Sequence, residues 1–406
     1  MNLSTEEREM LDGSQGRAVQ KAMQILVALG TIYDAPRMVS VASVLIAGVS
    51  YDNLGEAGLQ FLDEMAAGGG KAQVLATLNP AGMDVENWRA LGIPADFAEK
   101  QMRVLAAFQR MGVVTSCTCT PYLAGNVPHF SQHLAWSESS AVCYANAVLG
   151  ARTNREGGPS ALAAALTGRT AYYGYHLEEN RQPDLTVEVQ ARLLETSDFG
   201  ALGKLIGEKL ESDGAAHRLP YLRGVSAAAE GSLSLEKLKS FCASLATYGG
   251  AAMFHMEDIT PEAFRYAPPA ETLVVSQADL DRAGQELSDA TPEQADFFSL
   301  GCPHLSIREL ARLAELLQGK QVRGEFWLTT SRSVKQVADR MGYTRVIEAS
   351  GAKIAADTCC VVAPIKGRFR ILVTDSAKAC YYAYSKNKFK TVLLPFDEVV
   401  RRALGE

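Results

Sequence analysis

The sequence predicts an α/β fold of several subdomains, built from parallel βαβ units. Short β-branched runs alternate with amphipathic helical stretches along the chain, a pattern typical of strands joined by crossover helices. A chain of 406 residues also exceeds what one hydrophobic core usually supports, so two or three subdomains are expected. Since ligands bind at the carboxyl ends of the strands in such sheets, the loops there are the first place to look for a site.

The N-terminal part reads as three helices and three strands. Apolar residues at helical spacing predict helices over 15–29, with Gly30 as its end, and over 54–66 and 94–111. Strands are predicted over 38–46, 74–78 and 113–116. The second strand runs into the turn Asn79-Pro80-Ala81-Gly82, and the third into a loop over 117–122.

The C-terminal part continues the alternation. Strands are predicted over 185–189, 219–225, 323–329, 359–364, 370–374 and 391–394. Helices are predicted over 198–211, 233–249 and 306–317. The Pro-rich stretch 267–270 is predicted to connect two subdomains.

Composition and charge exclude several classes of function. Apolar residues make up 47% and charged residues 21%, which is ordinary for a globular protein, and the net charge of −6 without a basic run argues against nucleic acid or an anionic membrane as partner. The acidic start MNLSTEEREML has no signal-peptide pattern, and no apolar run approaches the ~20 residues of a membrane helix, so we expect a cytoplasmic protein. The absence of GxGxxG, GxxxxGK[ST] and GxSxG motifs argues against nucleotide-driven or serine-hydrolase chemistry.

Residues 116–181 concentrate the side chains that carry chemistry. Arg152, Asn154 and Arg155 are spaced to converge on one anion from a single turn, although a solvated surface pair is the alternative. Pro159 suits the first position of a helix, which places Gly157, Gly158 and Ser160 at its positive end. Ser139 and Ser140 follow Glu138 where another helix begins, so their hydroxyls either cap it or bind a ligand carboxylate. These groups together predict an anion-binding site.

Eight cysteines are present, and without a signal peptide we expect reduced thiols. Cys302 lies in the turn Gly-Cys-Pro-His, and Cys359 lies at the predicted start of a strand, so neither is a typical core position. Together with Cys119, they offer three thiolates from three distant loops, and three ligands leave one iron of a cubane cluster open. Cys117 and Cys360 are adjacent alternatives, whereas Cys143, Cys242 and Cys380 have apolar neighbours typical of packing.

Four motifs within residues 116–181 resemble the large subunit of the aconitase X family. They are CTPY (119–122), AWSESSAV (135–142), LGARTNREGGPSALAAALTGRT (149–170) and HLEENR (176–181). The resemblance extends over essentially the whole chain. It implies an aconitase-like fold and an iron–sulfur-dependent dehydratase of a small hydroxy acid. It also implies that the cluster ligands are Cys119, Cys302 and Cys359, which match the family's cysteines in CTPY, GCPH and DTC.

The resemblance assigns further residues to the site. Ser139, Ser140, Arg152, Arg155 and Lys378 are expected to be catalytic. Asn79, Glu138, Asn154, Gly157, Gly158, Ser160 and His176 are expected to bind substrate. Asn79 offers both a donor and an acceptor, and a structural role is the competing interpretation of His176. An exposed lysine at position 378 would carry no functional meaning without the resemblance.

The family also suggests a substrate and a partner. Its members include enzymes resembling archaeal phosphomevalonate dehydratase, which acts on mevalonate 5-phosphate, and bacterial cis-3-hydroxy-L-proline dehydratase. The segments Glu138-Ser139-Ser140, Asn79-Pro80-Ala81-Gly82 and 155–160 resemble the first more closely. A phosphate plus a carboxylate on the substrate would also explain two arginines at one turn. A cluster of the [4Fe–4S] type is preferred to [2Fe–2S]. The family's small swivelling domain is missing here, so we expect a separate small subunit that completes the site of a heterodimer. A non-enzymatic cluster-binding or regulatory protein is the alternative from another class.

Overall fold

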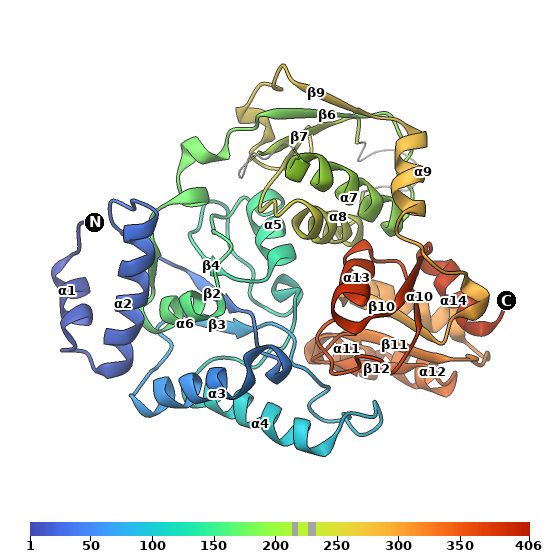
Figure 1. Cartoon of the computed structure of the whole chain (residues 1–406), viewed down its shortest axis with the longest axis horizontal. Helices are drawn as coiled ribbons and strands as arrows, with labels where there is room; N and C mark the ends of the chain where they lie inside the picture. The colour runs from blue at the N-terminus through green and yellow to red at the C-terminus, as the bar shows by residue number, and fades with distance from the viewer. Residues whose placement is uncertain (213–217, 226–232) are drawn as a thin grey trace.

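Parallel sheets with their own helices build the fold, as predicted (Figure 1). The computed structural model describes residues 1–212, 218–225 and 233–406. Within these residues the large sheets have three, four and five strands, and every pairing inside them is parallel. A small antiparallel pair, β1 with β5, stands apart. The α/β class predicted from the sequence is therefore confirmed.

The first unit carries the three-stranded sheet, in the order β3-β2-β4. Its elements are α1 (Thr5–Asp12), α2 (Arg17–Ile32), β1 (Met38–Ser40), β2 (Ser43–Ile46), α3 (Tyr51–Ala67), β3 (Leu75–Leu78), α4 (Ala95–Arg110), η1 (Pro121–Leu123), β4 (Ala135–Trp136), α5 (Ser139–Ala147), α6 (Gly158–Thr167), β5 (Arg169–Ala171), η2 (Gly174–His176) and η3 (Glu178–Arg181). Apolar faces of α2, α3, α4 and α6 pack on this sheet and form one core.

The second unit carries the four-stranded sheet, in the order β8-β7-β6-β9. Its elements are β6 (Leu185–Val189), α7 (Thr196–Ser212), β7 (Pro220–Arg223), α8 (Leu235–Tyr248), β8 (His255–Met256), η4 (Ala263–Arg265), β9 (Thr272–Val275) and α9 (Gln277–Gln285). The long helices α7 and α8 lie beneath the sheet. Phe199, Phe241 and Phe254 belong to the single apolar core that joins these helices to the strands. This unit lies at the top of Figure 1.

The third unit carries the five-stranded sheet, in the order β12-β11-β10-β13-β14. Its elements are η5 (Pro292–Gln294), β10 (Phe297–Leu305), α10 (Ile307–Leu317), β11 (Glu325–Thr330), α11 (Arg332–Met341), α12 (Tyr343–Ala349), β12 (Lys353–Ala356), β13 (Ile371–Thr374), α13 (Ala377–Tyr382), η6 (Ala383–Asn387), β14 (Lys390–Leu393) and α14 (Phe396–Leu404). Ser306 and Glu309 form a reciprocal cap at the start of α10, which is the amphipathic helix expected there.

Two element boundaries differ from those predicted. Helix α2 runs past Gly30 to Ile32, because Gly30 is buried and a side chain there would meet Met1 and Ala171. The glycine therefore serves packing and not helix termination. The predicted strand over 38–46 is interrupted, since its first three residues pair with β5 and its last four with β3 and β4.

Three segments have a different role from the one predicted. The predicted strand over 113–116 is absent, since Val114 makes only an isolated bridge with Thr77 of β3. The strand predicted over 359–364 is a loop, because the strand before it, β12, ends at Ala356. Cys359 therefore follows a strand instead of starting one. The Pro-rich stretch 267–270 leads into β9, which pairs with β6 of the same sheet. It therefore lies inside the second unit, and the chain passes to the third unit only after α9.

Strand β10 is irregular where Cys302 lies. Its pairing with β11 shifts register between Leu300 and Leu305, and the Cys302–Pro303 peptide bond is cis. Gly301 has φ of 108°, and a Cβ there would lie 2.2 Å from the carbonyl oxygen of Thr329 on β11. Only glycine allows this close approach. The irregularity takes Cys302 out of the ladder of the sheet.

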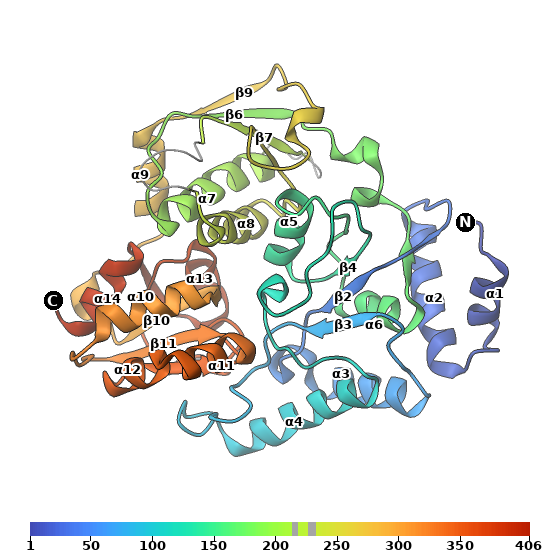
Figure 2. The same ribbon diagram turned by 180° about the vertical axis from the view of Figure 1, so that it is seen from behind.

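The first and third units meet behind this region (Figure 2). The guanidinium of Arg332, at the start of α11, binds the carboxylates of Asp84 in the first unit and Asp357 in the third. Ser50 donates its hydroxyl hydrogen to the carbonyl oxygen of Val362, and Ala81 donates its N–H to that of Asp357. The carboxyl ends of β3 and β12 are thereby held together.

Candidate active site

Glu138 lies at the centre of the predicted site. It precedes α5 and caps it, since its carboxylate accepts hydrogen bonds from the backbone N–H and the hydroxyl of Ser140. Asn79, in the turn after β3, donates its amide hydrogen to the other carboxylate oxygen at 2.9 Å. Lys378 reaches the same carboxylate from α13 in the third unit, 240 residues away. The structure therefore brings together four of the residues expected at the site.

The charges of this pair stabilise each other. Burial disfavours the ionised Glu138, but the Lys378 ammonium and the hydrogen bonds from Lys378 and Ser140 outweigh burial and lower its pKa to about 2. Burial also disfavours the charged Lys378, but Glu138 outweighs it and raises the lysine pKa above its usual value. Lys378 is 9% exposed. It is therefore a buried cation, not the solvated lysine that its sequence context suggests.

The two serines differ in their surroundings. Sequence considerations left Ser139 or Ser140 as the cap of α5, but the cap is Glu138 and both serines stand within the first turn. Ser140 donates its hydroxyl hydrogen to Glu138 at 3.0 Å. The hydroxyl of Ser139, which is 6% exposed, has no hydrogen-bond partner among the described residues. Ser139 is thus the one with a hydroxyl available to a ligand.

Three thiols surround Lys378. Burial, with the neighbouring Glu138 carboxylate and Cys359 thiol, raises the pKa of Cys119 to about 12. Burial raises the pKa of Cys302 well above its usual value, and Cys359 adds to that rise. Burial also raises the pKa of Cys359, against the N–H groups of Val361 and Val362 and the Lys378 charge. The three cysteines expected as ligands are therefore electrostatic neighbours around one ammonium group, and none is in a disulfide.

The alternative cysteines lie in apolar cores. Cys117 packs in the core of the first unit, where burial raises its pKa, and the carboxylate of Asp357 adds to the rise. Cys360 packs with Phe297 and Trp327 in a core of the third unit, and burial raises its pKa to about 12. Cys143, Cys242 and Cys380 are likewise buried in apolar clusters, as expected for packing residues.

Arg152 and Arg155 do not converge on one anion as predicted. Arg152 is 8% exposed and forms ion pairs with Glu178 and, at 3.5 Å, with Glu262. Arg155 is exposed, and its side chain has no partner among the described residues. Its backbone forms an isolated β-bridge with Trp136, two residues before Glu138. The backbone here is extended, so residues three apart point to opposite sides. Only Arg155 is free to hold an anion.

The amide of Asn154 is occupied within the chain. It donates to the carbonyl oxygen of Tyr173 at 3.0 Å and accepts from the N–H of Tyr175 at 2.9 Å. Ser160 is occupied too, since its hydroxyl accepts from the N–H of Gly157 at 3.0 Å and donates to the carboxylate of Glu156 at 2.5 Å. Both residues therefore shape the loop instead of offering it to a ligand.

Gly157 is exposed at the start of α6, while Gly158 lines a largely apolar cavity of about 200 Å³. A Cβ at Gly158 would lie 2.8 Å from the carbonyl oxygen of Ala47 at the end of β2. Ser137, next to Glu138, lines the same cavity. The glycine thus lets α6 approach the carboxyl end of the first sheet, where ligands bind in such folds.

His176 does not lie at Glu138 but near the arginines Arg152 and Arg181, whose charges act on it. Its Nδ1 lies 2.9 Å from Nδ1 of His133, and its buried Nε2 has no partner among the described residues. Burial lowers its pKa to about 3, with His133 and the two arginines contributing. Arg181 itself is fully buried and binds Glu262 at 2.8 Å. We call Arg152, Arg181, Glu178 and Glu262 the closed cluster.

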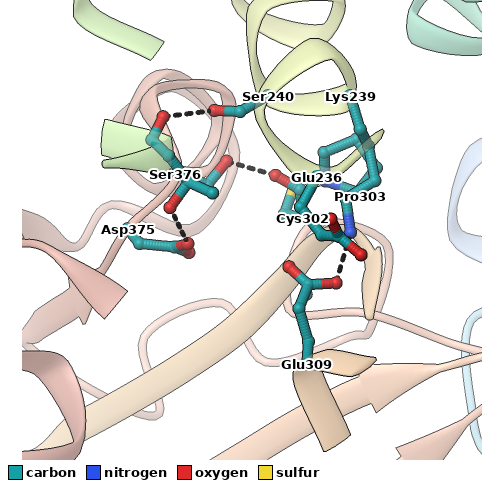
Figure 3. Close-up of a pocket in the computed structure, with 10 residues that line it drawn as sticks. Glu236, Lys239, Ser240, Cys302, Pro303, Glu309, Asp375 and Ser376 are labelled. Carbon is teal, nitrogen blue, oxygen red and sulfur yellow. Dashed lines mark hydrogen bonds and ion pairs between the residues drawn. The ribbon is translucent and has the colours of Figure 1, made fainter. Parts of the chain in front are cut away.

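A small polar pocket lies behind Cys302 (Figure 3). Ser376 donates its hydroxyl hydrogen to the carbonyl oxygen of Cys302, and Lys239 pairs with Glu309 on the opposite wall. Asp375 accepts a hydrogen bond from Thr196, and burial raises its pKa to about 6, with the Glu309 charge adding to the rise. The volume of about 10 Å³ is near the minimum needed for one water molecule.

Sequence reasoning missed His304, which lies among the cysteines. Its Nε2 donates to the carbonyl oxygen of Thr358 at 2.9 Å, its Nδ1 lies 3.0 Å from the hydroxyl of Thr118, and its N–H donates to the sulfur of Cys119 at 3.3 Å. Burial lowers its pKa to about 4. The sequence signal for His304 is its place in Gly-Cys-Pro-His, two residues after Cys302. Because it is a single histidine, the HxxxH pattern of paired metal ligands does not include it.

None of the helices in the described ranges is long and apolar enough to cross a membrane. Among the same residues, no three His, Cys, Asp or Glu side chains are grouped so that they could hold one metal ion. The three thiols are therefore not arranged as the ligands of a mononuclear centre.

Comparison with known proteins agrees with the geometry. Residues 1–179 match the aconitase X first domain, 183–285 the second domain and 295–405 the third domain. A phosphomevalonate dehydratase large subunit from Methanothermobacter thermautotrophicus is 47% identical over 93% of this chain and 92% of its own length. A cis-3-hydroxy-L-proline dehydratase from Pseudomonas aeruginosa is 34% identical, over 93% of this chain but 65% of its own length.

Among solved structures, the crystal structure of Thermococcus kodakaraensis aconitase X in its holo-form has a TM-score of 0.91. It is 41% identical and covers 99% of this chain and 100% of its own. The matched relatives named above are dehydratases. These matches span all three units, so this chain belongs to the aconitase X family.

Proposed function

We propose that this chain is the large subunit of a hydro-lyase that removes water from mevalonate 5-phosphate to give anhydromevalonate phosphate. The observation that carries the proposal is the Glu138–Lys378 pair, which joins the first and third units beside three thiols, two buried and that of Cys302 partly buried. The choice of substrate is supported by the relatives, since the phosphomevalonate dehydratase subunit is closer than the hydroxyproline enzyme. The two arginines at one turn do not support this choice, because Arg152 is engaged by Glu178 and Glu262.

The residues of the site fit an iron–sulfur cluster. Cys119, Cys302 and Cys359 supply three soft sulfur donors, and in such clusters each cysteine binds a different iron. The hydroxyl of Thr358, next to Cys359, is buried without a partner. An unsatisfied buried hydroxyl is costly, and a bound group would satisfy it. We propose that these three cysteines hold a cluster, of the [4Fe–4S] type, whose open iron supplies Lewis acidity at the leaving hydroxyl.

The chain's own polar groups would orient the substrate. The buried Oδ1 of Asn79 has no partner, while its Nδ2 is fixed by Glu138. Asn79 can therefore accept a hydrogen bond only from a ligand donor such as a hydroxyl. Ser139 offers a second free hydroxyl, and Arg155 a free guanidinium for a phosphate or carboxylate. Lys378, kept charged by Glu138, would stabilise negative charge that develops on the substrate carboxylate.

We propose that a separate small subunit completes the site. The relative from Methanothermobacter is named a large subunit, and Arg155 is exposed and open to further partners. The eight cysteines are free, which supports a reducing compartment, the cytoplasm.

The test is anaerobic and uses two substrates. The chain is purified alone and with the small protein encoded beside it, then loaded with iron and sulfide. Dehydration of mevalonate 5-phosphate and of cis-3-hydroxy-L-proline is followed by NMR. We expect turnover of the first, and only with both subunits. Turnover of hydroxyproline alone would overturn the substrate, and substantial activity of the single chain would overturn the partner.

The cysteine assignment is tested separately by iron content. Cys119→Ala, Cys302→Ala and Cys359→Ala should each fail to retain the cluster, whereas Cys117→Ala and Cys360→Ala should retain it. Loss of iron in Cys360→Ala with retention in Cys359→Ala would reverse that part of the assignment. Arg155→Ala should lose turnover while keeping its cluster and fold, and full turnover would contradict the role of Arg155 in the site. A wild-type pair of subunits that holds its cluster but turns over neither substrate would favour a cluster-binding protein without catalytic function.

A further inference from the structure

His304 is the point at which all three units meet. It lies on β10 two residues after Cys302, in the third unit. Its N–H donates to the sulfur of Cys119 from the first unit. Its carbonyl oxygen accepts a hydrogen bond, at 2.8 Å, from Lys239 on α8 of the second unit.

The imidazole connects two of the cysteine loops. The carbonyl oxygen of Thr358 can only accept, so Nε2 carries the hydrogen and donates to it. In the neutral ring Nδ1 then accepts, and the hydroxyl of Thr118 donates to it. Thr118 and Thr358 immediately precede Cys119 and Cys359. The ring thus fixes the distance between the two loops that carry these thiols.

The surroundings make this connection rigid. His304, Thr118 and Thr358 are each 0% exposed, so water cannot replace these hydrogen bonds. The hydroxyl of Thr118 also accepts from the N–H of Thr120, which fixes its direction. Lys239 is held by Glu309 at 2.7 Å.

We propose that His304 is a positioning residue that sets the three cysteine thiols relative to one another before a cluster is bound. The proposal rests on the proposed function in taking these cysteines as the ligands. Groups that orient metal ligands typically change metal affinity 10–100-fold when removed. The imidazole would act in this way through the residues before the ligands, without touching the substrate.

Three substitutions separate the two side-chain contacts. His304→Ala removes both. His304→Gln keeps a donor at the position of Nε2, and His304→Asn keeps an acceptor at the position of Nδ1. The matched control is His255→Ala, since His255 is also 0% exposed and makes one hydrogen bond, to the carbonyl oxygen of Arg181 at 2.8 Å, away from the cysteines.

The first measurement is the rate at which reconstituted full-length chain releases iron to a chelator under anaerobic conditions. We expect release from His304→Ala to be about 10–100-fold faster than from the wild type, with His304→Gln and His304→Asn between them. His255→Ala should lower the melting temperature but release iron at the wild-type rate. Equal release rates for His304→Ala and His255→Ala would overturn the proposal. If His304→Ala does not fold, the Gln and Asn variants decide by the same comparison.

The second measurement does not need a cluster. Iodoacetamide labelling of the metal-free chain, followed residue by residue with mass spectrometry, should be faster at Cys119 and Cys359 in His304→Ala than in the wild type. Cys143 should be unchanged. A wild-type chain that takes up no iron would contradict the proposed function, while the labelling would still decide on His304. Unchanged labelling at Cys119 and Cys359 would contradict the positioning role.

Discussion

Two charge clusters in this molecule, each built around a buried ion pair, consist of similar residues and differ in the groups that lie beside them. In the closed cluster, Arg181 binds Glu262 and Arg152 binds Glu178 and Glu262. In the site around Glu138 and Lys378, the charges are matched just as well. Each cluster has a buried acceptor without a hydrogen bond among the described residues, Glu262 Oε1 in the first and Asn79 Oδ1 beside the second. Beside the second lie also three free thiols and the buried, unpartnered hydroxyl of Thr358.

The comparison shows that a buried ion pair does not by itself mark an active site. Such pairs hold distant segments together, and removal of one partner is costly wherever they lie. The free thiols beside the pair distinguish the second cluster, whereas a buried acceptor without a hydrogen bond occurs in both. The variants below test whether this distinction holds.

The largest expected effect is on stability, in the closed cluster. Arg181→Met leaves the fully buried carboxylate of Glu262 without its main partner and should lower the free energy of unfolding by about 3–5 kcal/mol. Anaerobic urea denaturation would measure it. The folded fraction should keep a kcat within a few fold of wild type. A kcat reduced as strongly as by substitution of Lys378 would contradict the distinction between the clusters.

Lys378→Met should lower kcat of the two-subunit enzyme by about 10²–10³-fold, because a charge that stabilises the reacting substrate is lost. It should also lower stability, since Glu138 stays buried. The double variant Glu138→Gln/Lys378→Met separates the two effects. It should recover much of the stability, because no unpaired charge remains, but not the turnover. Recovery of turnover would show that the pair is structural.

Asp375 belongs to neither cluster and provides a reference: it is a buried carboxylate with no ion-pair partner among the described residues. Its folded-state pKa of about 6 exceeds the usual 3.8, so its relative contribution to stability is present below pH 4 and is lost as the pH rises through 6. Asp375→Asn should therefore be more stable than wild type by about 3 kcal/mol at pH 8 and equal at pH 4. Melting curves at both values would measure this, and a pH-independent difference would contradict it.

The smallest effect concerns the free arginine. Arg155→Gln should raise KM about 10-fold or more, as expected for the loss of a hydrogen bond to a charged ligand. The free energy of unfolding should stay within about 0.5 kcal/mol, because the side chain has no partner among the described residues. Arg152→Gln should show the opposite pattern, with lower stability and little change in KM at low denaturant. Identical patterns for both would show that the two arginines share one role after all.

The sequence predicted the alternation of elements well, because helix and strand periodicity is local. It failed where a distant contact decides. Gly30 stays inside α2 because Met1 and Ala171 pack against it. The segment 359–364 was predicted as a strand because it contains the β-branched pair Val361 and Val362, but it is the loop that follows β12.

The site shows the same division. The motif around Glu138 and the three cysteines could be named from the sequence, because the resemblance covers them. Spacing could not reveal that Arg152 is bound by Glu178 and Glu262, or that Lys378 is buried against Glu138, since these partners are remote in the chain. His304 was missed for a similar reason, since its partners Thr118 and Thr358 are 186 and 54 residues away in the chain.

The distance of 240 residues between Glu138 and Lys378 has a consequence for biosynthesis. At roughly 5–20 residues per second, the ribosome makes Glu138 on the order of 10–50 s before its lysine. The first unit can fold in that interval, but burial of Glu138 before Lys378 arrives would leave the carboxylate without the cation that keeps its pKa low. The nascent first unit must therefore keep this edge hydrated until the last unit emerges. The candidate site can therefore lose its water only after the third unit has emerged.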